Sequence, residues 1–238
     1  MLPVAILAGG LATRLLPLTE KVPKALLPIH GEPFIAHQLR LLAAAGVKRV
    51  VLCVGYLGEL IQEFVGDGSR FRLTADFSFD GPTLRGTAGA IQQALPQLGP
   101  EFFVLYGDSY LPCDYRAVQA AYRASGKEAL MTVFRNDGQW DTSNVDYSGG
   151  RIWAYDKKNP TSCMHYIDYG LGIFHDSAFA AKVGCQAHDL ADIYRDLLAC
   201  GALAGFEMHE RFYEIGSATG LKEFSDYLAK RIGTEAMG

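Results

Sequence analysis

The first residues whose types and spacing suggest chemistry are the glycine pair Gly9-Gly10 and the cations Arg14 and Lys24. The glycines follow the short apolar run Val4–Leu7, which predicts a buried strand that ends in a sharp turn. Backbone amides in such a turn can bind an anion, and two nearby cations favour a polyphosphate. An ordinary strand-to-helix turn would explain the glycines alone. It would not explain two cations in a proline-stiffened loop, so we predict a phosphate-binding loop.

Two common phosphate motifs are absent from this loop. The dinucleotide fingerprint needs glycines at its first, third and sixth positions, which the stretch from Gly9 to Arg14 does not supply. A Walker loop needs Gly-Lys-Ser/Thr, but Gly126-Lys127 is followed by Glu128. The predicted phosphate site is therefore of another kind.

A second chemical feature is Asp108, which follows Gly107 at the end of an apolar strand predicted over residues 102–106. A lone aspartate at a strand end is often a turn former or a helix cap. Beside a polyphosphate site, however, a carboxylate suits Mg²⁺, which takes one or two carboxylates with water completing the shell. Glu214, flanked by apolar residues and followed by a turn of small residues, is the best second carboxylate. We expect Asp108 and Glu214 to hold Mg²⁺.

Other catalytic centres find no support in the sequence. The six histidines form no HExxH spacing, and no G-x-S-x-G elbow is present. The five cysteines are odd in number and contain no CxxC pair, so we expect reduced thiols, with neither a disulfide framework nor a thiolate zinc site.

The elements that must position these residues alternate between strand and helix through about residue 125. This alternation predicts a mainly parallel sheet flanked by helices, with ligands bound at the carboxyl ends of its strands. The expected strands here are residues 4–7, 50–54, 71–77 and 102–106, and the expected helices are residues 33–45, 57–65 and 87–95.

From residue 129 the pattern changes to short strands separated by Gly, Asn, Asp and Pro, which predicts an antiparallel or mixed extension. The expected elements there are strands over residues 130–134, 144–147, 151–155, 165–174 and 203–208, and helices over residues 189–199 and 218–232. We interpret residues 1–238 as a single domain with a nucleotide-binding half (1–125) and a second half (126–238).

Composition limits the partners. A formal charge of −4 without a basic run argues against a nucleic-acid partner. No apolar stretch approaches the roughly 20 residues that span a bilayer, and the N-terminus lacks the basic region of a signal peptide. We expect a cytoplasmic protein without a membrane partner, and the sequence leaves open whether it forms a homo-oligomer.

The opening stretch resembles the signature of the sugar-1-phosphate nucleotidylyltransferases, Leu-Ala-Gly-Gly-x-Gly-Thr-Arg-Leu followed by Pro-Lys. The matching residues run from Leu7 to Leu15, with Pro23-Lys24. Shorter matches follow in the family's order, and they are Gly86-Thr87-Ala88-Gly89, Gly107-Asp108, Asp156-Lys157, Tyr169-Gly170 and Ile215-Gly216-Ser217. The length is similar to the short branch that includes muramate-1-phosphate uridylyltransferases and manno-heptose-1-phosphate guanylyltransferases.

The resemblance implies a Rossmann-like enzyme with a small antiparallel sugar-binding extension. Such an enzyme joins a nucleoside triphosphate to a sugar 1-phosphate, releasing pyrophosphate, with Mg²⁺ bound by Asp108 and Glu214. By the same resemblance, Arg14 and Lys24 are catalytic. The nucleotide would contact Leu7, Ala8, Gly9, Gly10, Gly86 and Thr87, and the sugar phosphate would contact Asn144, Asp156, Lys157, Asp168 and Gly170.

Four positions depart from the family pattern. Ala12 replaces the third glycine of the signature, and Glu214 stands where aspartate is commoner. Asp156 replaces the usual glutamate before Lys157, and Asn144 stands where glycine is often found. None of these changes removes a charge that the chemistry requires.

Two other functions remain open on the sequence. A catalytically inactive nucleotide-sugar-binding regulatory protein could share the fold, because fold alone does not give activity. The joint presence of Arg14, Lys24, Asp108 and Lys157 favours the enzyme. A glycosyltransferase that uses nucleotide sugars would usually carry a DxD-type motif, whereas Asp108 is followed by Ser109 and Tyr110. The base and the sugar are not readable from the sequence.

Overall fold

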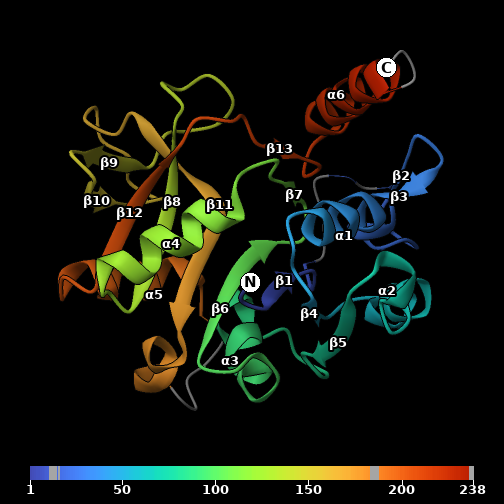
Figure 1. The fold of residues 1–238 in the computed structure, drawn as a ribbon, viewed down its shortest axis with the longest axis horizontal. Helices are drawn as coiled ribbons and strands as arrows, with labels where there is room; N and C mark the ends of the chain where they lie inside the picture. Colours follow the sequence, from blue (N-terminus) through green and yellow to red (C-terminus); the bar gives the residue numbers. More distant parts are fainter. Residues whose placement is uncertain (11–14, 16, 183–187, 236–238) are drawn as a thin grey trace.

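The centre of the fold is the short strand β1 (Val4–Leu7), which lies between two parallel neighbours (Figure 1). The computed structural model describes residues 1–10, 15, 17–182 and 188–235. In it, β1 pairs with β4 (Arg49–Val54) on one side and β6 (Glu101–Tyr106) on the other. The first three residues of β1 are fully buried because helices cover both faces, as the apolar sequence predicts.

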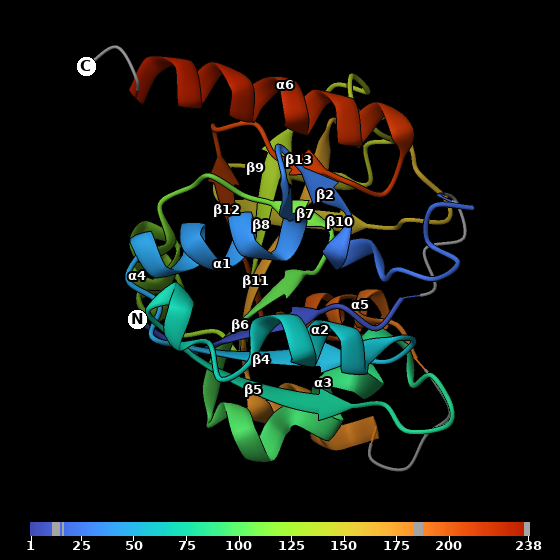
Figure 2. The same ribbon diagram turned by 90° about the vertical axis from the view of Figure 1, so that its right-hand side faces the viewer.

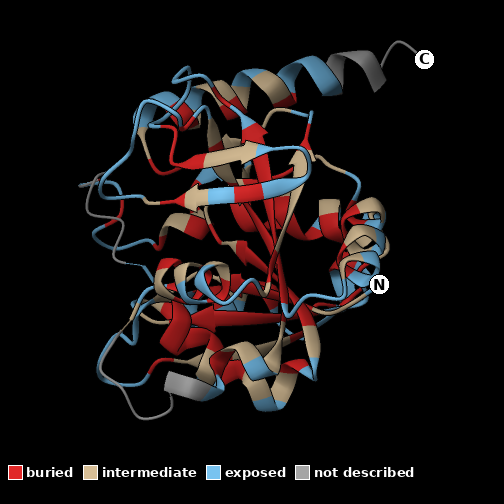
Figure 3. Ribbon diagram, turned by 90° about the vertical axis from the view of Figure 1, so that its left-hand side faces the viewer, coloured by how far each residue is buried: buried red, intermediate tan, exposed pale blue. Residues whose placement is uncertain are grey.

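The parallel half is completed by one more strand and by helices on both faces, so the alternating pattern is confirmed. Strand β5 (Thr74–Phe79) pairs with β4 in parallel. One face of the sheet is covered by α1 (Phe34–Ala44), α2 (Gly58–Val65) and α4 (Tyr115–Ser125), and the other by α3 (Gly86–Leu98) and α5 (Leu190–Ala199). Figure 3 shows the central strands buried between helices with exposed outer surfaces.

The second half extends the same sheet. Strand β11 (Tyr166–His175) pairs antiparallel with β6, so the sheet is continuous across both predicted halves. Beyond it lie β8 (Ala129–Arg135), β9 (Val145–Ser148), β10 (Arg151–Tyr155) and β12 (Leu203–Met208). All of these pairs are antiparallel except β12 with β8, which is parallel. The predicted mixed extension is confirmed.

Two predictions of local structure differ from the structure. The strand predicted over residues 71–77 begins at Thr74, because Ser69–Phe71 forms a 3-10 turn and Arg72 takes a left-handed φ of 63°. The sequence reading also missed α4. Its start is capped by Asp114, whose carboxylate accepts hydrogen bonds from the backbone N–H groups of Arg116 and Ala117.

Short elements frame the edge of the sheet where β1 and β6 end. Strand β7 (Ser109–Tyr110) pairs with β13 (Tyr213–Glu214), and β2 (Pro28–Ile29) pairs with β3 (Glu32–Pro33). The remaining short elements are the 3-10 segments Lys24–Leu26 and Asp176–Lys182. Helix α6 (Ala218–Glu235) lies across this end of the molecule, where Phe224 packs against Phe34 and Tyr110 (Figure 2). None of the described helices is long and apolar enough to cross a bilayer.

The close approach of β1 and β6 at their carboxyl ends gives a test of the fold. A Cβ on Gly107 would lie 2.6 Å from the carbonyl oxygen of Leu7 and 2.9 Å from the Cα of Ala8. Both are backbone atoms that cannot move aside, so Gly107→Ala should lower the free energy of unfolding by about 1–3 kcal/mol. Urea unfolding followed by circular dichroism measures this change.

The matched control is Gly10→Ala in the facing turn, where an added Cβ meets no atom of the described residues within 4 Å. This variant should unfold at the urea concentration of the unmodified protein or slightly above it. Equal stability of the two variants would contradict the close packing of the two strand ends.

Candidate active site

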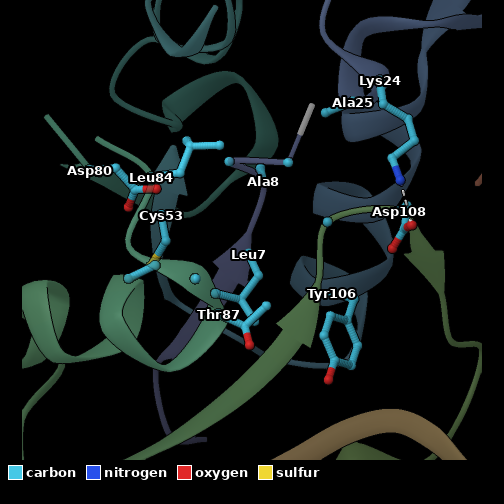
Figure 4. Close-up of a pocket in the computed structure, with 15 residues that line it drawn as sticks. Leu7, Ala8, Lys24, Ala25, Cys53, Asp80, Leu84, Thr87, Tyr106 and Asp108 are labelled. Carbon is cyan, nitrogen blue, oxygen red and sulfur yellow. Dashed lines mark hydrogen bonds and ion pairs between the residues drawn. The ribbon is translucent and has the colours of Figure 1, made fainter. Parts of the chain in front are cut away.

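A cleft opens at the carboxyl ends of β1, β4 and β6, and eight predicted site residues line it together (Figure 4). The sequence predicts that they lie in one nucleotide and metal site. They are Leu7, Ala8, Gly9, Gly10, Lys24, Gly86, Thr87 and Asp108. Arg14 and Ala12 lie outside the described residues.

Lys24 and Asp108 face each other at one end of the cleft (Figure 4). The Lys24 Nζ lies 2.6 Å from the Asp108 Oδ2, and the two side chains are 20% and 25% exposed. Lys24 begins a 3-10 turn after Pro23, and Asp108 sits between β6 and β7, so both come from tight local turns. Partial burial strengthens interactions of these charges with a ligand relative to bulk water.

The walls of the cleft are formed in part by backbone. A Cβ on Gly9 would lie 3.1 Å from the backbone nitrogen of Gly55, which leaves little room for a side chain. The backbone N–H of Gly107 donates to the carbonyl of Leu7, at 2.9 Å, and joins the two strand ends. Absence of side chains lets a ligand approach these turns closely, as the glycine pattern predicts.

Glu214 lies next to Asp108 along the backbone, but it is not among the residues that line the cleft. The backbone N–H of Ile215 donates to the carbonyl of Asp108 at 2.9 Å. The Glu214 carboxylate accepts hydrogen bonds from the backbone N–H of Gly216 and, at 2.9 Å, from the hydroxyl of Ser217. These bonds place it at the start of α6, and no group of three or more His, Cys, Asp or Glu side chains suited to a metal occurs among the described residues.

A second cluster adjoins the cleft through Tyr106, which lines it. The Lys157 Nζ lies 3.3 Å from the Asp168 Oδ2 and donates to the Tyr106 hydroxyl at 3.3 Å. The hydroxyl of Tyr155 donates to Asp168 at 3.4 Å, and the Asp168 side chain is only 3% exposed. The sequence reading assigned Lys157 and Asp168 to the sugar phosphate, and the structure brings them together beside the cleft.

The charge state of Lys157 is set by competing effects. Burial acts to lower the pKa of Lys157, but the Asp168 carboxylate and Tyr106 outweigh it and hold that pKa above its ordinary value. Burial raises the pKa of Tyr106 well above its ordinary value, so its hydroxyl stays protonated. The cluster therefore presents a cation next to a neutral phenol.

Two predicted sugar-site residues hold Asp168 in place. The Asn144 Oδ1 accepts the backbone N–H of Asp168 at 3.0 Å, and Asn144 is itself buried. The backbone N–H of Gly170 donates to the Asp168 Oδ1 at 3.0 Å, and Gly170 has a φ of 94° that favours glycine. Between Asp168 and Gly172 the register of β11 against β8 shifts, as in a bulge that redirects side chains near a site.

Asp156 is turned away from this cluster. Its carboxylate accepts the backbone N–H groups of Asn159 and Lys158, at 3.0 and 2.7 Å. These bonds lower the pKa of Asp156 below its ordinary value. In this arrangement Asp156 shapes the loop after β10, and the structure does not bring it to the cleft.

The cleft also contains residues that the sequence reading did not assign to a site. The main ones are Cys53, Asp80, Leu84 and Tyr106. Tyr106 could have been found as the last residue of the strand before Gly107-Asp108. Asp80 stands before Gly81-Pro82, a pattern that reads as an ordinary turn. Cys53 and Leu84 carry no local signal that separates them from core residues.

Comparisons with known proteins show which family has this sequence and this fold. The sequence model of a family described as nucleotidyl transferase matches residues 4–144. The chain belongs to this nucleotidyl transferase family. A mannose-1-phosphate guanyltransferase of Gibberella zeae is 36% identical over 179 residues, which cover 72% of this chain and 49% of that protein. An N-acetylmuramate alpha-1-phosphate uridylyltransferase of Neisseria meningitidis is 39% identical over 113 residues, covering 47% of this chain and 49% of that protein.

The mannose-1-phosphate guanylyltransferase catalytic subunit beta of Danio rerio is 31% identical over 218 residues, which cover 89% of this chain and 60% of that protein. The chain spans between about half and 60% of the length of these three curated relatives. Shared sequence therefore establishes the family, and the activity of the whole relatives carries over only as a proposal.

Solved structures support the same fold. A putative glucose-1-phosphate thymidylyltransferase from Bacillus anthracis superimposes with a TM-score of 0.85 at 21% identity, covering 96% of this chain and 95% of that chain. HddC from Yersinia pseudotuberculosis, complexed with GMP-PN, gives 0.80 at 22% identity, covering 96% of this chain and 100% of that chain. At this identity the likeness concerns the fold alone, and it confirms the Rossmann-like architecture.

The bonds of Glu214 at the start of α6 give a stability test. Glu214→Ala removes the acceptor for the Gly216 N–H and the Ser217 hydroxyl, so the free energy of unfolding should fall by about 1 kcal/mol. Thermal and urea unfolding without added metal measure the change. Glu210→Ala, an exposed glutamate before the same strand, is the matched control and should unfold like the unmodified protein. An unchanged stability of Glu214→Ala would show that these bonds do not hold α6.

Proposed function

We propose that the protein transfers a nucleoside monophosphate from a nucleoside triphosphate to a sugar 1-phosphate, giving a nucleotide sugar and pyrophosphate. The observation that carries the proposal is that one charged pair lies in the cleft and a second charged pair lies directly beside it. Lys24 and Asp108 occupy one end, and the Lys157–Asp168 pair adjoins it through Tyr106. Membership of the nucleotidyl transferase family supports the reaction class.

The reaction requires positioning and charge neutralisation. An oxygen of the sugar phosphate attacks the α-phosphorus of the triphosphate, and the bond from that phosphorus to the pyrophosphate oxygen breaks on the opposite side. In this proposal Lys24 and Arg14 contact the triphosphate and stabilise negative charge on the leaving pyrophosphate. Backbone groups of Leu7 to Gly10, with Gly86 and Thr87, hold the nucleoside so that the reacting atoms are aligned.

The donor set of the cleft fits a Mg²⁺ ion through Asp108. Mg²⁺ in phosphoryl-transfer sites is commonly held by one or two carboxylates together with substrate phosphates and water. Asp108 is such a carboxylate at the triphosphate end of the cleft. Glu214, whose oxygens accept hydrogen bonds from Gly216 and Ser217, would be the second carboxylate. When bound, the ion neutralises charge on the phosphates of the nucleotide.

Lys157 is the proposed contact for the phosphate of the sugar. Its ammonium is held by Asp168 and Tyr106, so it is already oriented before substrate binds. Asn144 and Gly170 fix Asp168, and through it they position the cation. We propose that the Asp156 carboxylate stabilises the loop after β10, and that this loop contacts the sugar.

We infer a cytoplasmic location because nucleoside triphosphates are the proposed substrates. The relatives named for mannose 1-phosphate and N-acetylmuramate 1-phosphate support a hexose-type sugar 1-phosphate as the acceptor. We treat residues 1–238 as one catalytic domain, since a single sheet runs through both halves.

A matrix of nucleoside triphosphates against sugar 1-phosphates, read as pyrophosphate release, tests the function. At least one pair should release pyrophosphate with Mg²⁺. With that pair, Lys24→Ala and Asp108→Ala should each lower kcat by about 10²–10³-fold, because each removes a charged group at the triphosphate end.

The control is Lys21→Ala, an exposed lysine three residues before Lys24, which should retain the activity of the unmodified protein. Pyrophosphate release at the normal rate by Asp108→Ala would refute the metal assignment. Failure of every pair would favour a nucleotide-sugar-binding protein without catalysis.

The Lys157–Asp168 pair predicts a change in pH dependence. In the unmodified protein the raised pKa keeps Lys157 charged as pH rises from 7 to 10. Asp168→Asn removes the carboxylate that contributes most to raising this pKa, so burial, opposed only by Tyr106 and Asp189, lowers the pKa of Lys157 relative to the unmodified protein. In the variant, kcat/KM for the sugar 1-phosphate should fall about tenfold per pH unit above the lowered pKa.

The measurement is the pH profile of kcat/KM for the unmodified protein, Asp168→Asn and Asp146→Asn. Asp146 lies on β9 outside the Lys157 cluster, so its variant should keep the shape of the unmodified profile. Identical profiles for all three proteins would show that Asp168 does not hold the charge of Lys157.

A further inference from the structure

Asp80 is a buried carboxylate at the end of the cleft opposite Lys24 and Asp108 (Figure 4). It directly follows β5, and its backbone N–H donates to the carbonyl of Val54 at 2.9 Å, so its place is fixed by the sheet. The residue is 6% exposed. Neither the sequence motifs nor the proposed transfer chemistry uses this side chain.

The Asp80 carboxylate has few donors for a buried charge. Its Oδ2 accepts one long hydrogen bond, 3.5 Å from the backbone N–H of Arg85. The Arg85 Nε donates to the Asp80 backbone carbonyl at 3.0 Å, and within the described part of the chain Oδ1 has no hydrogen-bond partner. Burial raises the pKa of Asp80 above its ordinary value, against the opposing effect of Arg85. A buried carboxylate with free acceptor positions is stabilised by a ligand that supplies donors.

The surroundings of Asp80 suit the flat face of an uncharged ring. Cys53 and Leu84 lie beside Asp80 (Figure 4), and the cleft is also lined by the apolar side chains of Leu7 and Ala90. Burial, together with the nearby Asp80 charge, raises the pKa of the Cys53 thiol to about 12, so this wall is uncharged at neutral pH. A phosphate would be repelled by Asp80 and attracted by Lys24 at the other end. The two ends therefore orient a nucleotide with its base at Asp80.

We propose that Asp80 selects guanine as the base of the nucleotide. This inference rests on the proposed function, since it concerns the same nucleotide site. The Watson–Crick edge of guanine carries two adjacent donors, the N1–H and the 2-amino group. One carboxylate accepts both in a bidentate arrangement, with one oxygen for each donor.

The other bases cannot make this pair of bonds. Uracil and thymine offer a single N3–H flanked by two carbonyl oxygens, so the second carboxylate oxygen would face an acceptor. Adenine and cytosine present an amino group beside a ring nitrogen that is an acceptor. A buried acceptor placed against another acceptor discriminates strongly, because neither group can be solvated.

The test is equilibrium binding of GTP, ITP and UTP with Mg²⁺ and without sugar phosphate, measured by isothermal titration calorimetry. ITP differs from GTP only by loss of the 2-amino group, which isolates one of the two bonds. The unmodified protein should bind GTP about ten- to a hundredfold more tightly than ITP, and UTP at least as weakly as ITP. This comparison needs no variant.

The same affinities measured on the variant Asp80→Asn provide a second test. Its amide keeps an acceptor for the Arg85 N–H, so the loop before α3 should fold, which circular dichroism and the Tm confirm. The amide N–H₂ faces one guanine donor, so the ratio of GTP to ITP affinity should fall close to one. Asp108→Asn, the other carboxylate of the cleft, should change GTP and ITP affinity by the same factor and keep the ratio.

Tight and equal binding of GTP and ITP, or preferential binding of UTP, would overturn the role of Asp80. Either result would leave the proposed transfer intact, because pyrophosphate release with another triphosphate would still show it. An unchanged GTP preference in a folded Asp80→Asn variant would also overturn the inference. Absence of binding by all three triphosphates would instead remove the proposed function together with this inference.

Discussion

The structure depends on the parallel pairing of β1 with both β4 and β6. Because the three strands run in the same direction, their carboxyl ends meet at one edge, with Leu7 opposite both Cys53 and Tyr106. The hydrogen bond from the Gly107 N–H to the Leu7 carbonyl continues this pairing beyond the strands. The turns after these strands therefore share one cleft, although those after β1 and β6 lie about a hundred residues apart in sequence.

The sequence was sufficient to locate one end of this cleft. Glycines after a buried strand, a lysine in a proline-stiffened loop and an aspartate after another buried strand are local patterns with local causes. Parallel pairing then brings them together, so Gly9, Lys24 and Asp108 were predictable as neighbours. The helix and strand positions followed from periodicity, except for helix α4 and for the turn at Ser69–Phe71 before β5.

The rest of the site depends on which partner a side chain takes, and a single sequence does not carry that information. Glu214 was predicted beside Asp108, and the β7–β13 pairing does bring their backbones together. Its carboxylate nevertheless accepts bonds at the start of α6, because the Gly216 N–H and Ser217 hydroxyl lie closer in the chain. Asp80 was not predicted as a site residue, because Asp80-Gly81-Pro82 has the pattern of an ordinary turn. The sequence does not show that the Asp80 carboxylate has few hydrogen-bond partners in the folded protein.

The sheet extension supplies the other side of the site by reversing direction. Strand β11 runs antiparallel to β6 with Leu171 opposite Leu105, so the residues before Leu171 lie beyond the end of β6. This places Asp168 next to Tyr106, and the register shift after Asp168 with the left-handed Gly170 directs its carboxylate toward Lys157. A continuous sheet thus explains why the parallel half and the mainly antiparallel half of the chain contribute to one site.

The two carboxylates of the cleft, Asp80 and Asp108, have different partners, so the two ends of the cleft suit different parts of a ligand. Asp108 is paired with Lys24, so that end has a cation and a carboxylate, which suits phosphates and a metal ion. Asp80 has only a long bond from the Arg85 N–H and lies among apolar side chains, which suits a neutral ring with donors. A nucleotide bound in the proposed orientation would extend from Asp80 toward Lys24. Its phosphates would then approach Tyr106, whose hydroxyl contacts Lys157, so the acceptor phosphate and the triphosphate would meet at the end of β6.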